Sequence, residues 1–309
     1  MLFLFKDKCK EGNAKRRRVG FFRLGMMNQL ANQIPVRGLF FLQKSIKILP
    51  EVLLMFEKLL TVDDLTVSYS GKKVVRGVNF SVKRGEILII AGESGSGKST
   101  ILKAIGGLLG KGGAITGGRI FFYERDITDL PEGERRKISG NAIGMIFQNA
   151  GASFCPIRTI GDQIFESVRA HRDWDKNFFR ERAIDFMQKI NLDSTALDEY
   201  PFRLSGGMAQ RAGILAATIL EPKLLLADEP TSALDVVTQV GVVKELLNLR
   251  GRQKISIVLV THDLKIARRM ADKILIMRHG AAVEFGTREQ IFDEPQETYT
   301  RELIKAANL

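Results

Sequence analysis

Short hydrophobic runs alternate with polar and glycine-rich stretches from about residue 60 to the C-terminus. Within residues 65–69 and again within residues 74–82, apolar and polar positions alternate, as they do in strands with one buried face. Residues 70–73, with the sequence Ser-Gly-Lys-Lys, predict a hairpin turn between the two segments. The folded part of the chain is therefore expected to begin with an antiparallel β unit.

Five further runs are almost entirely apolar, which is typical of strands that are buried on both faces of a parallel sheet. They span residues 86–91, 143–147, 223–227, 255–260 and 274–277. A helix is predicted from Lys98 onwards, and a second over residues 180–190, where the apolar spacing is helical. Residues 150–215 carry no strong strand pattern, so we predict a helical insert there. The pattern as a whole predicts an α/β fold.

The composition of the 309 residues supports a folded protein with a sizeable core, because 45% are hydrophobic and 27% are charged. No uninterrupted apolar stretch approaches the roughly 18 residues that a membrane-spanning helix needs. The two cysteines, Cys9 and Cys155, lie too far apart in the sequence to form a metal-binding motif, and they build no disulfide framework. This cysteine usage indicates a reducing compartment.

Most of the net charge of +12 lies near the N-terminus. Residues 1–60 hold 12 Lys/Arg and 4 Asp/Glu, whereas residues 61–309 hold 35 and 31. We predict a basic extension over residues 1–59 and a folded domain over residues 60–309, and nucleic-acid binding is disfavoured because the domain is nearly balanced. Three interpretations of the extension stay open: a poorly ordered leader, sequence upstream of a natural start at Met55, and an amphipathic segment on a membrane surface.

A glycine-rich loop between a predicted strand and a predicted helix carries the strongest motif. It fits G-x-x-x-x-G-K-[ST] and consists of Gly92, Glu93, Ser94, Gly95, Ser96, Gly97, Lys98, Ser99 and Thr100. Glycines allow such a loop to wrap phosphates closely with its N–H groups, and the helix N-terminus adds partial positive charge. Lys98 is expected to reach the β- and γ-phosphates of a nucleotide, and Ser99 to ligate Mg²⁺.

Two acidic residues end a later apolar run. Asp228 and Glu229 follow Leu-Leu-Leu-Ala, which is the Walker-B pattern. We expect Asp228 to hold Mg²⁺ and Glu229 to polarise the water that attacks the γ-phosphate.

A third motif identifies a family. Residues 204–211, Leu-Ser-Gly-Gly-Met-Ala-Gln-Arg, resemble the LSGGQ signature of ATP-binding-cassette (ABC) ATPases. The other marks of that family are also present, in the expected order along the chain. They are the adenine-stacking aromatic at Tyr69, the Q-loop at Gln148, the D-loop at residues 232–235 ending in Asp235, and the switch histidine at His262. The resemblance covers residues 60–309.

The resemblance implies a P-loop NTPase cassette with a RecA-like core, an antiparallel β subdomain and a helical insert, which binds ATP and Mg²⁺. Gln148 would join Ser99 and Asp228 at the metal, and His262 would sense the γ-phosphate as a second catalytic residue beside Glu229. The signature residues would cover an ATP bound to a second cassette. They are Ser205, Gly206, Gly207 and Met208.

Within the family the chain is most similar to the ATPases of dipeptide, oligopeptide and nickel importers. The features that carry this likeness are Met208 in the signature, the loop at residues 92–97, and residues 156–163 and 299–303. Such a subunit would lie on the cytoplasmic face of the membrane. Its partners would be two permease subunits, a second, non-identical ABC ATPase and, indirectly, an extracellular binding protein, with no nucleic acid. An exporter ATPase is the alternative, and the sequence leaves peptide and nickel or metal chelate open as cargo.

Overall fold

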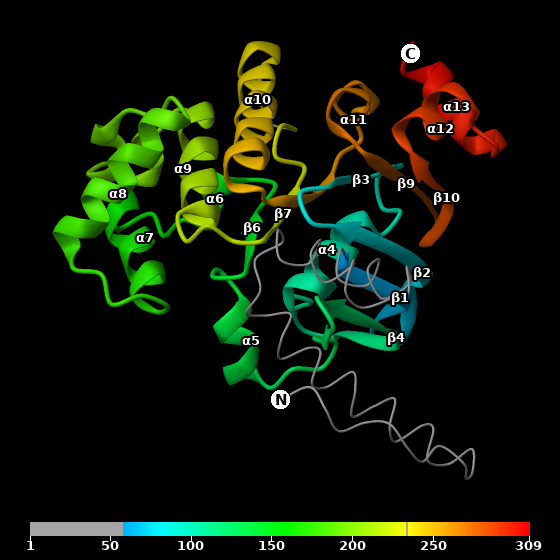
Figure 1. The fold of residues 1–309 in the computed structure, drawn as a ribbon, viewed down its shortest axis with the longest axis horizontal. Coiled ribbons are helices and arrows are strands. Elements are labelled where there is room, and N and C mark those ends of the chain that lie inside the picture. Colours follow the sequence, from blue (N-terminus) through cyan, green and yellow to red (C-terminus); the bar gives the residue numbers. More distant parts are fainter. Residues whose placement is uncertain (1–57, 233) are drawn as a thin grey trace, which may run out of the picture. The chain divides into compact units, whose positions relative to one another are not determined.

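A computed structural model of the protein describes residues 58–232 and 234–309 (Figure 1). The basic extension predicted over residues 1–59 lies outside these residues, except for Lys58 and Leu59, which begin the first strand. In residues 58–232 and 234–309 the strands form a four-stranded and a six-stranded sheet. No helix in these two ranges is long and apolar enough to cross a membrane.

The smaller sheet is antiparallel and has the order β2-β1-β4-β5. Its strands are β1 (Lys58–Tyr69), β2 (Lys72–Lys83), β4 (Gly113–Phe122) and β5 (Arg125–Asp126). The predicted hairpin is confirmed, since β1 and β2 pair across a turn at Ser70 and Gly71. Strand β4, which has no counterpart in the sequence-based prediction, pairs with the other side of β1.

The larger sheet has the order β10-β9-β3-β8-β7-β6, and only its β10–β9 pair is antiparallel. Its strands are β3 (Ile87–Gly92), β6 (Ile143–Ile146), β7 (Leu224–Asp228), β8 (Ser256–Val260), β9 (Lys273–Arg278) and β10 (Ala281–Thr287). All five apolar runs form parallel strands as predicted. Because parallel strands end at the same edge of a sheet, the loops after β3, β6, β7 and β8 meet there.

Helices connect and cover the strands (Figure 1). The α-helices are α4 (Lys98–Gly106), α5 (Glu132–Ile138), α6 (Ala150–Ser153), α7 (Ile160–Arg169), α8 (Lys176–Lys189), α9 (Gly206–Thr218), α10 (Val236–Gln253), α11 (Leu264–Met270), α12 (Arg288–Asp293) and α13 (Thr298–Ala306). Two 3₁₀ turns are η1 (Ser194–Leu197) and η2 (Pro201–Arg203). The helical insert is present as predicted, because the segment from α6 to α9 contains no strand among its described residues.

The two faces of the larger sheet contribute to two separate hydrophobic cores. Along β3, Ile87 and Ile89 face a core that includes α9, α10 and the helical insert. Leu88 and Ile90 face a second core with α4 and the antiparallel sheet. Every residue of β3 is buried, which explains why its sequence is a continuous apolar run. The buried strand also fixes the position of the glycine loop that follows it.

Candidate nucleotide-binding site

The glycine loop joins β3 to α4 through backbone conformations that favour glycine. Gly92 has a φ of 141°, and a Cβ there would lie 2.0 Å from the carbonyl oxygen of Met277 on β9. Gly97 caps α4 in a left-handed conformation with a φ of 96°, and its Cβ would lie 2.9 Å from the oxygen of Val74. The loop is thus enclosed by backbone from β2 and β9, and side chains at these two positions would displace it.

The lysine of the loop folds back onto the loop itself. Lys98 Nζ donates to the carbonyl oxygens of Gly92 at 2.9 Å and Glu93 at 2.6 Å. Burial lowers the pKa of Lys98, while the nearby carboxylates of Glu229 and Asp228 act in the opposite direction. Unlike Lys98, the buried hydroxyl of Ser96 has no hydrogen-bond partner in residues 58–232 and 234–309. A cation and a free donor in one loop are suited to phosphate oxygens.

Ser99 and Asp228 meet although 129 residues separate them in the sequence. The Ser99 hydroxyl in the first turn of α4 donates to Asp228 Oδ1 at the end of β7, at 2.7 Å. Burial raises the pKa of Asp228, and the hydrogen bond from Ser99 opposes this shift. A hydroxyl and a carboxylate side by side are hard oxygen ligands, so this pair fits a Mg²⁺ ion that keeps water in its other positions.

Glu229 lies between a glutamine and a histidine from two other strand ends. Its Oε2 accepts from Gln148 Nε2 at 3.3 Å and lies 3.3 Å from His262 Nδ1. The residue itself has a φ of 44°, and its N–H donates to the oxygen of Val260 at 3.0 Å. A left-handed backbone is uncommon for Glu and turns this side chain out of the strand direction toward its two partners. The structure therefore brings the predicted Q-loop, Walker-B and switch residues together.

The signature and D-loop residues form adjoining helix starts. Ser205 caps α9 by accepting from the N–H of Met208 at 3.3 Å. Asp235 caps α10 by accepting from two backbone N–H groups and from the Thr238 hydroxyl, and these bonds lower its pKa. The two starts are packed closely, since a Cβ on Gly207 would lie 3.0 Å from Thr238 Cγ2. In the described part of the chain no hydrogen bond joins the signature residues to the glycine loop.

Tyr69 lies at the end of β1 in the antiparallel sheet. It pairs with Gly113 of β4, and a Cβ on that glycine would lie 2.7 Å from Tyr69 Cε1, so the ring lies across the neighbouring strand. Of the remaining motif residues, Ser94 and Gly95 lie between β3 and α4, and Thr100 is the third residue of α4. The backbone N–H groups of Ser94 and Gly95 belong to the same loop as those of Ser96 and Gly97.

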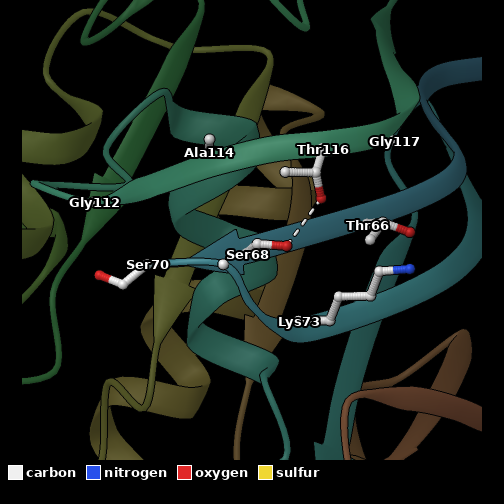
Figure 2. Close-up of a pocket in the computed structure, with 9 residues that line it drawn as sticks. Thr66, Ser68, Ser70, Lys73, Gly112, Ala114, Thr116 and Gly117 are labelled. Atoms are coloured by element: carbon white, nitrogen blue, oxygen red, sulfur yellow. Dashed lines mark hydrogen bonds between the residues drawn. The ribbon is translucent and has the colours of Figure 1, made fainter.

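A hollow of about 540 Å³ on the antiparallel sheet is separate from this site (Figure 2). It is lined mainly by small and hydroxyl-bearing residues of β1 and β4, with Lys73 from β2. Figure 2 shows Ser68 and Thr116 turned toward each other, with their hydroxyls 3.0 Å apart. No residue of the glycine loop lines it, so it is not the place where that loop holds a phosphate group.

Two contacts of the glycine loop come from the C-terminal part of the chain and were not predicted from the sequence. The N–H of Gly280, in the turn between β9 and β10, donates to the oxygen of Ser96 at 3.2 Å. The N–H of Glu93 donates to the hydroxyl of Tyr299 on α13 at 3.3 Å. The sequence signal for the second contact is that Tyr299 is the first residue of the stretch 299–303, which resembles one branch of the family. This resemblance does not predict where Tyr299 lies in the fold.

A parallel sheet, a glycine loop leading into a helix, and an acidic strand end bound to that helix define a P-loop NTPase. A family model described as ABC transporter matches residues 75–232. The dipeptide transport ATP-binding protein DppD of Escherichia coli is 41% identical over 254 residues, which cover 80% of this chain and 78% of that protein. The metal-staphylopine import system ATP-binding protein CntD of Staphylococcus aureus is 36% identical over 250 residues, covering 80% and 92%.

Solved structures of ATP-binding cassettes are also similar to this chain. A dimeric ATP-binding cassette in a post-hydrolysis state with ADP and phosphate has a TM-score of 0.67 at 29% identity, covering 74% of this chain and 98% of that chain. A cassette of Clostridium perfringens that is part of the transporter complex cbiONQ has a TM-score of 0.68 at 27% identity, covering 82% and 95%. The chain belongs to the ABC transporter family, and it is an ATPase.

Proposed function

We propose that this ATPase is the energy-supplying subunit of an importer for peptides, for nickel or for a chelated metal. The observation that carries the catalytic part is the position of Glu229 between Gln148 and His262, beside the Ser99–Asp228 pair. The importer part is supported by relatives whose names include dipeptide transport, oligopeptide transport and metal-staphylopine import. The proposed location of the subunit is the cytoplasmic face of a membrane, beside a permease.

Each site residue has a proposed role that follows from its chemistry. The N–H groups of the glycine loop and the ammonium of Lys98 bind the ATP phosphates. Ser99, Asp228 and Gln148 would hold Mg²⁺, which would neutralise charge on the β- and γ-phosphates. Glu229 orients the attacking water and accepts its proton, and His262 holds the Glu229 carboxylate in place and contacts the γ-phosphate. Tyr69 stacks on the adenine.

One chain supplies only part of each ATP site in this proposal. Ser205 caps α9, and Gly206, Gly207 and Met208 form its first turn. Among the described residues none of them hydrogen-bonds to the glycine loop of its own chain, so they are free to cover an ATP on a second cassette. Beside Asp235 the first residues of α10 are apolar and exposed, with Val236 at 74% and Val237 at 83%. Exposed valines next to a functional loop favour a protein partner. By resemblance to the importer branch, that partner is a different cassette.

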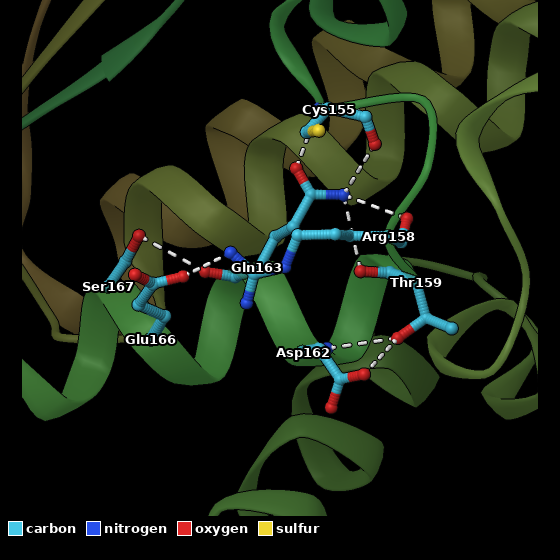
Figure 3. A network of polar contacts seen from close by, with 7 residues as sticks. All are labelled: Cys155, Arg158, Thr159, Asp162, Gln163, Glu166 and Ser167. Atoms are coloured by element: carbon cyan, nitrogen blue, oxygen red, sulfur yellow. Dashed lines mark hydrogen bonds and ion pairs between the residues drawn. The ribbon is translucent and has the colours of Figure 1, made fainter.

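The loop at residues 154–159, which follows Gln148 and α6, is a candidate contact for the permease, and the side chains of Gln163 and Glu166 on α7 hold it (Figure 3). Gln163 Oε1 accepts from the N–H of Cys155 at 2.7 Å, and its Nε2 donates to the carbonyls of Cys155 at 3.1 Å and Arg158 at 3.0 Å. Ile157 is carried at the centre of this loop and is 81% exposed. A large apolar side chain presented by a fixed loop is suited to docking.

Replacing Ile157 with Asp is expected to reduce recovery of the permease with the tagged chain about ten-fold or more, because a charge would enter the apolar contact. ATP binding by the purified chain is expected to stay at the wild-type value, since no hydrogen bond joins this loop to the glycine loop among the described residues. Leu108→Asp, at another exposed apolar position, is the matched control. Equal recovery for both variants would remove the loop from the proposed interface.

The transport role is tested by isolating the tagged full-length chain from its native membranes and identifying its partners by mass. Recovery of two permeases and a second, different cassette is expected. The companion binding protein is then screened against peptides and nickel, which decides the cargo. Recovery of the chain alone, or with ribosomes, would overturn the transport role, and recovery with an export permease would favour the exporter alternative.

A further inference from the structure

The C-terminal helix α13 contacts the glycine loop through one tyrosine. Tyr299 is the second residue of α13 and is 7% exposed. Its hydroxyl accepts the N–H of Glu93 at 3.3 Å, across 206 positions of sequence. Burial raises the pKa of Tyr299, so the hydroxyl stays neutral at physiological pH.

The peptide group between Gly92 and Glu93 is held from both sides. A trans peptide directs its C=O and its N–H in opposite directions. Lys98 Nζ donates to the C=O of Gly92 at 2.9 Å, and the Tyr299 hydroxyl accepts from the N–H of Glu93. One lysine of the loop and one tyrosine of α13 therefore hold this peptide.

The position of the ring is itself fixed by an arginine. The Arg278 guanidinium carbon lies 4.4 Å from the centre of the Tyr299 ring, within the range of a cation–π contact. The same guanidinium has its Nε 4.0 Å from a carboxylate oxygen of Glu93. Arg278 ends β9, so the hydroxyl reaches the loop from a site that is supported by both the sheet and α13.

Nucleotide binding is expected to change only one of the two contacts that hold this peptide, the one made by Lys98. When the ammonium of Lys98 turns to the phosphates, the C=O of Gly92 loses its charged donor. The N–H of Glu93 points the other way, so we expect its bond to Tyr299 to persist. The tyrosine hydrogen bond thus contributes more once nucleotide is bound, and an interaction that is stronger in the bound state raises affinity.

We propose that Tyr299 is a positioning residue for nucleotide binding, which holds the start of the glycine loop when Lys98 moves from the loop carbonyls to the phosphates. The inference rests on the proposed role of Lys98 in the ATP site. It assigns a role in the nucleotide site to Tyr299, the first residue of the C-terminal stretch 299–303.

The test removes this one hydroxyl and measures affinity of the full-length chain for labelled ATP and ADP. Tyr299→Phe keeps the ring and its contact with Arg278 but leaves the N–H of Glu93 without its acceptor. We expect the Kd for both nucleotides to rise about five-fold, while the melting temperature falls less without nucleotide than with it, because Lys98 still holds the peptide when no nucleotide is bound.

Thr300→Val is the matched control on the same helix. Thr300 is fully buried, and its hydroxyl has no hydrogen-bond partner within the described ranges, so the variant removes a hydroxyl without removing a bond. It is expected to bind nucleotide as the wild type does. Unchanged affinity of Tyr299→Phe, or an equal loss in both variants, would overturn the role of the tyrosine. Failure of the wild-type chain itself to bind ATP would instead overturn the proposed function.

Discussion

Replacing Glu229 with Gln is expected to reduce ATP turnover by about 10²- to 10⁴-fold, because the amide cannot accept the proton of the attacking water. An amide oxygen can still accept from Gln148, which donates to Glu229 at 3.3 Å, so the site keeps its shape. ATP binding is therefore expected to persist, and the unhydrolysed nucleotide should trap the chain and its partner cassette as a stable dimer. Phosphate release and size-exclusion chromatography with Mg²⁺ and ATP measure the two effects.

The control for this variant is Glu124→Gln, which makes the same chemical change at an exposed turn between β4 and β5. It should leave turnover unchanged. If Glu229→Gln hydrolysed ATP within about two-fold of the wild-type rate, Glu229 would not be the group that activates water.

Replacing Lys98 with Ala is expected to weaken ATP binding about 100-fold, because charge-assisted hydrogen bonds to the phosphates are lost. The same change removes the donor to the carbonyls of Gly92 and Glu93, so the free loop also loses a hold on its shape. Equilibrium titration of the full-length chain with a labelled nucleotide measures the loss. Lys111→Ala, an exposed lysine in the turn after α4, should bind ATP normally. A similar affinity of both variants would contradict the role of Lys98.

The sequence predicts the central sheet well because its strands are buried on both faces. The apolar runs around Ile89, Leu225 and Val258 leave little alternative to parallel strands, and all three are fully buried. The residues that we propose for the nucleotide site, Gln148, Glu229 and His262, each follow such a strand, and parallel strands end at one edge. The structure places Gln148, Glu229 and His262 at that edge, in direct contact.

Two other features could not be predicted from local pattern. Strand β4 contains Gly113, Gly117 and Gly118, which remove the alternation of side chains from which a strand is recognised. It forms because β1 pairs with it along most of its length, across two register shifts. The bond between Glu93 and Tyr299 depends on how α13 packs after the whole sheet has formed, and no spacing along the chain encodes that distance.

The placement of β3 between β8 and β9 has a consequence for the order of events during synthesis. Both neighbours come from residues beyond 255, and the last support of the glycine loop comes from Tyr299. A chain still growing on the ribosome has made the glycine loop long before it has made the strands that hold the loop in place. We therefore expect ATP to bind only to nearly complete chains, whereas chains released early expose the apolar β3 to aggregation and to chaperones.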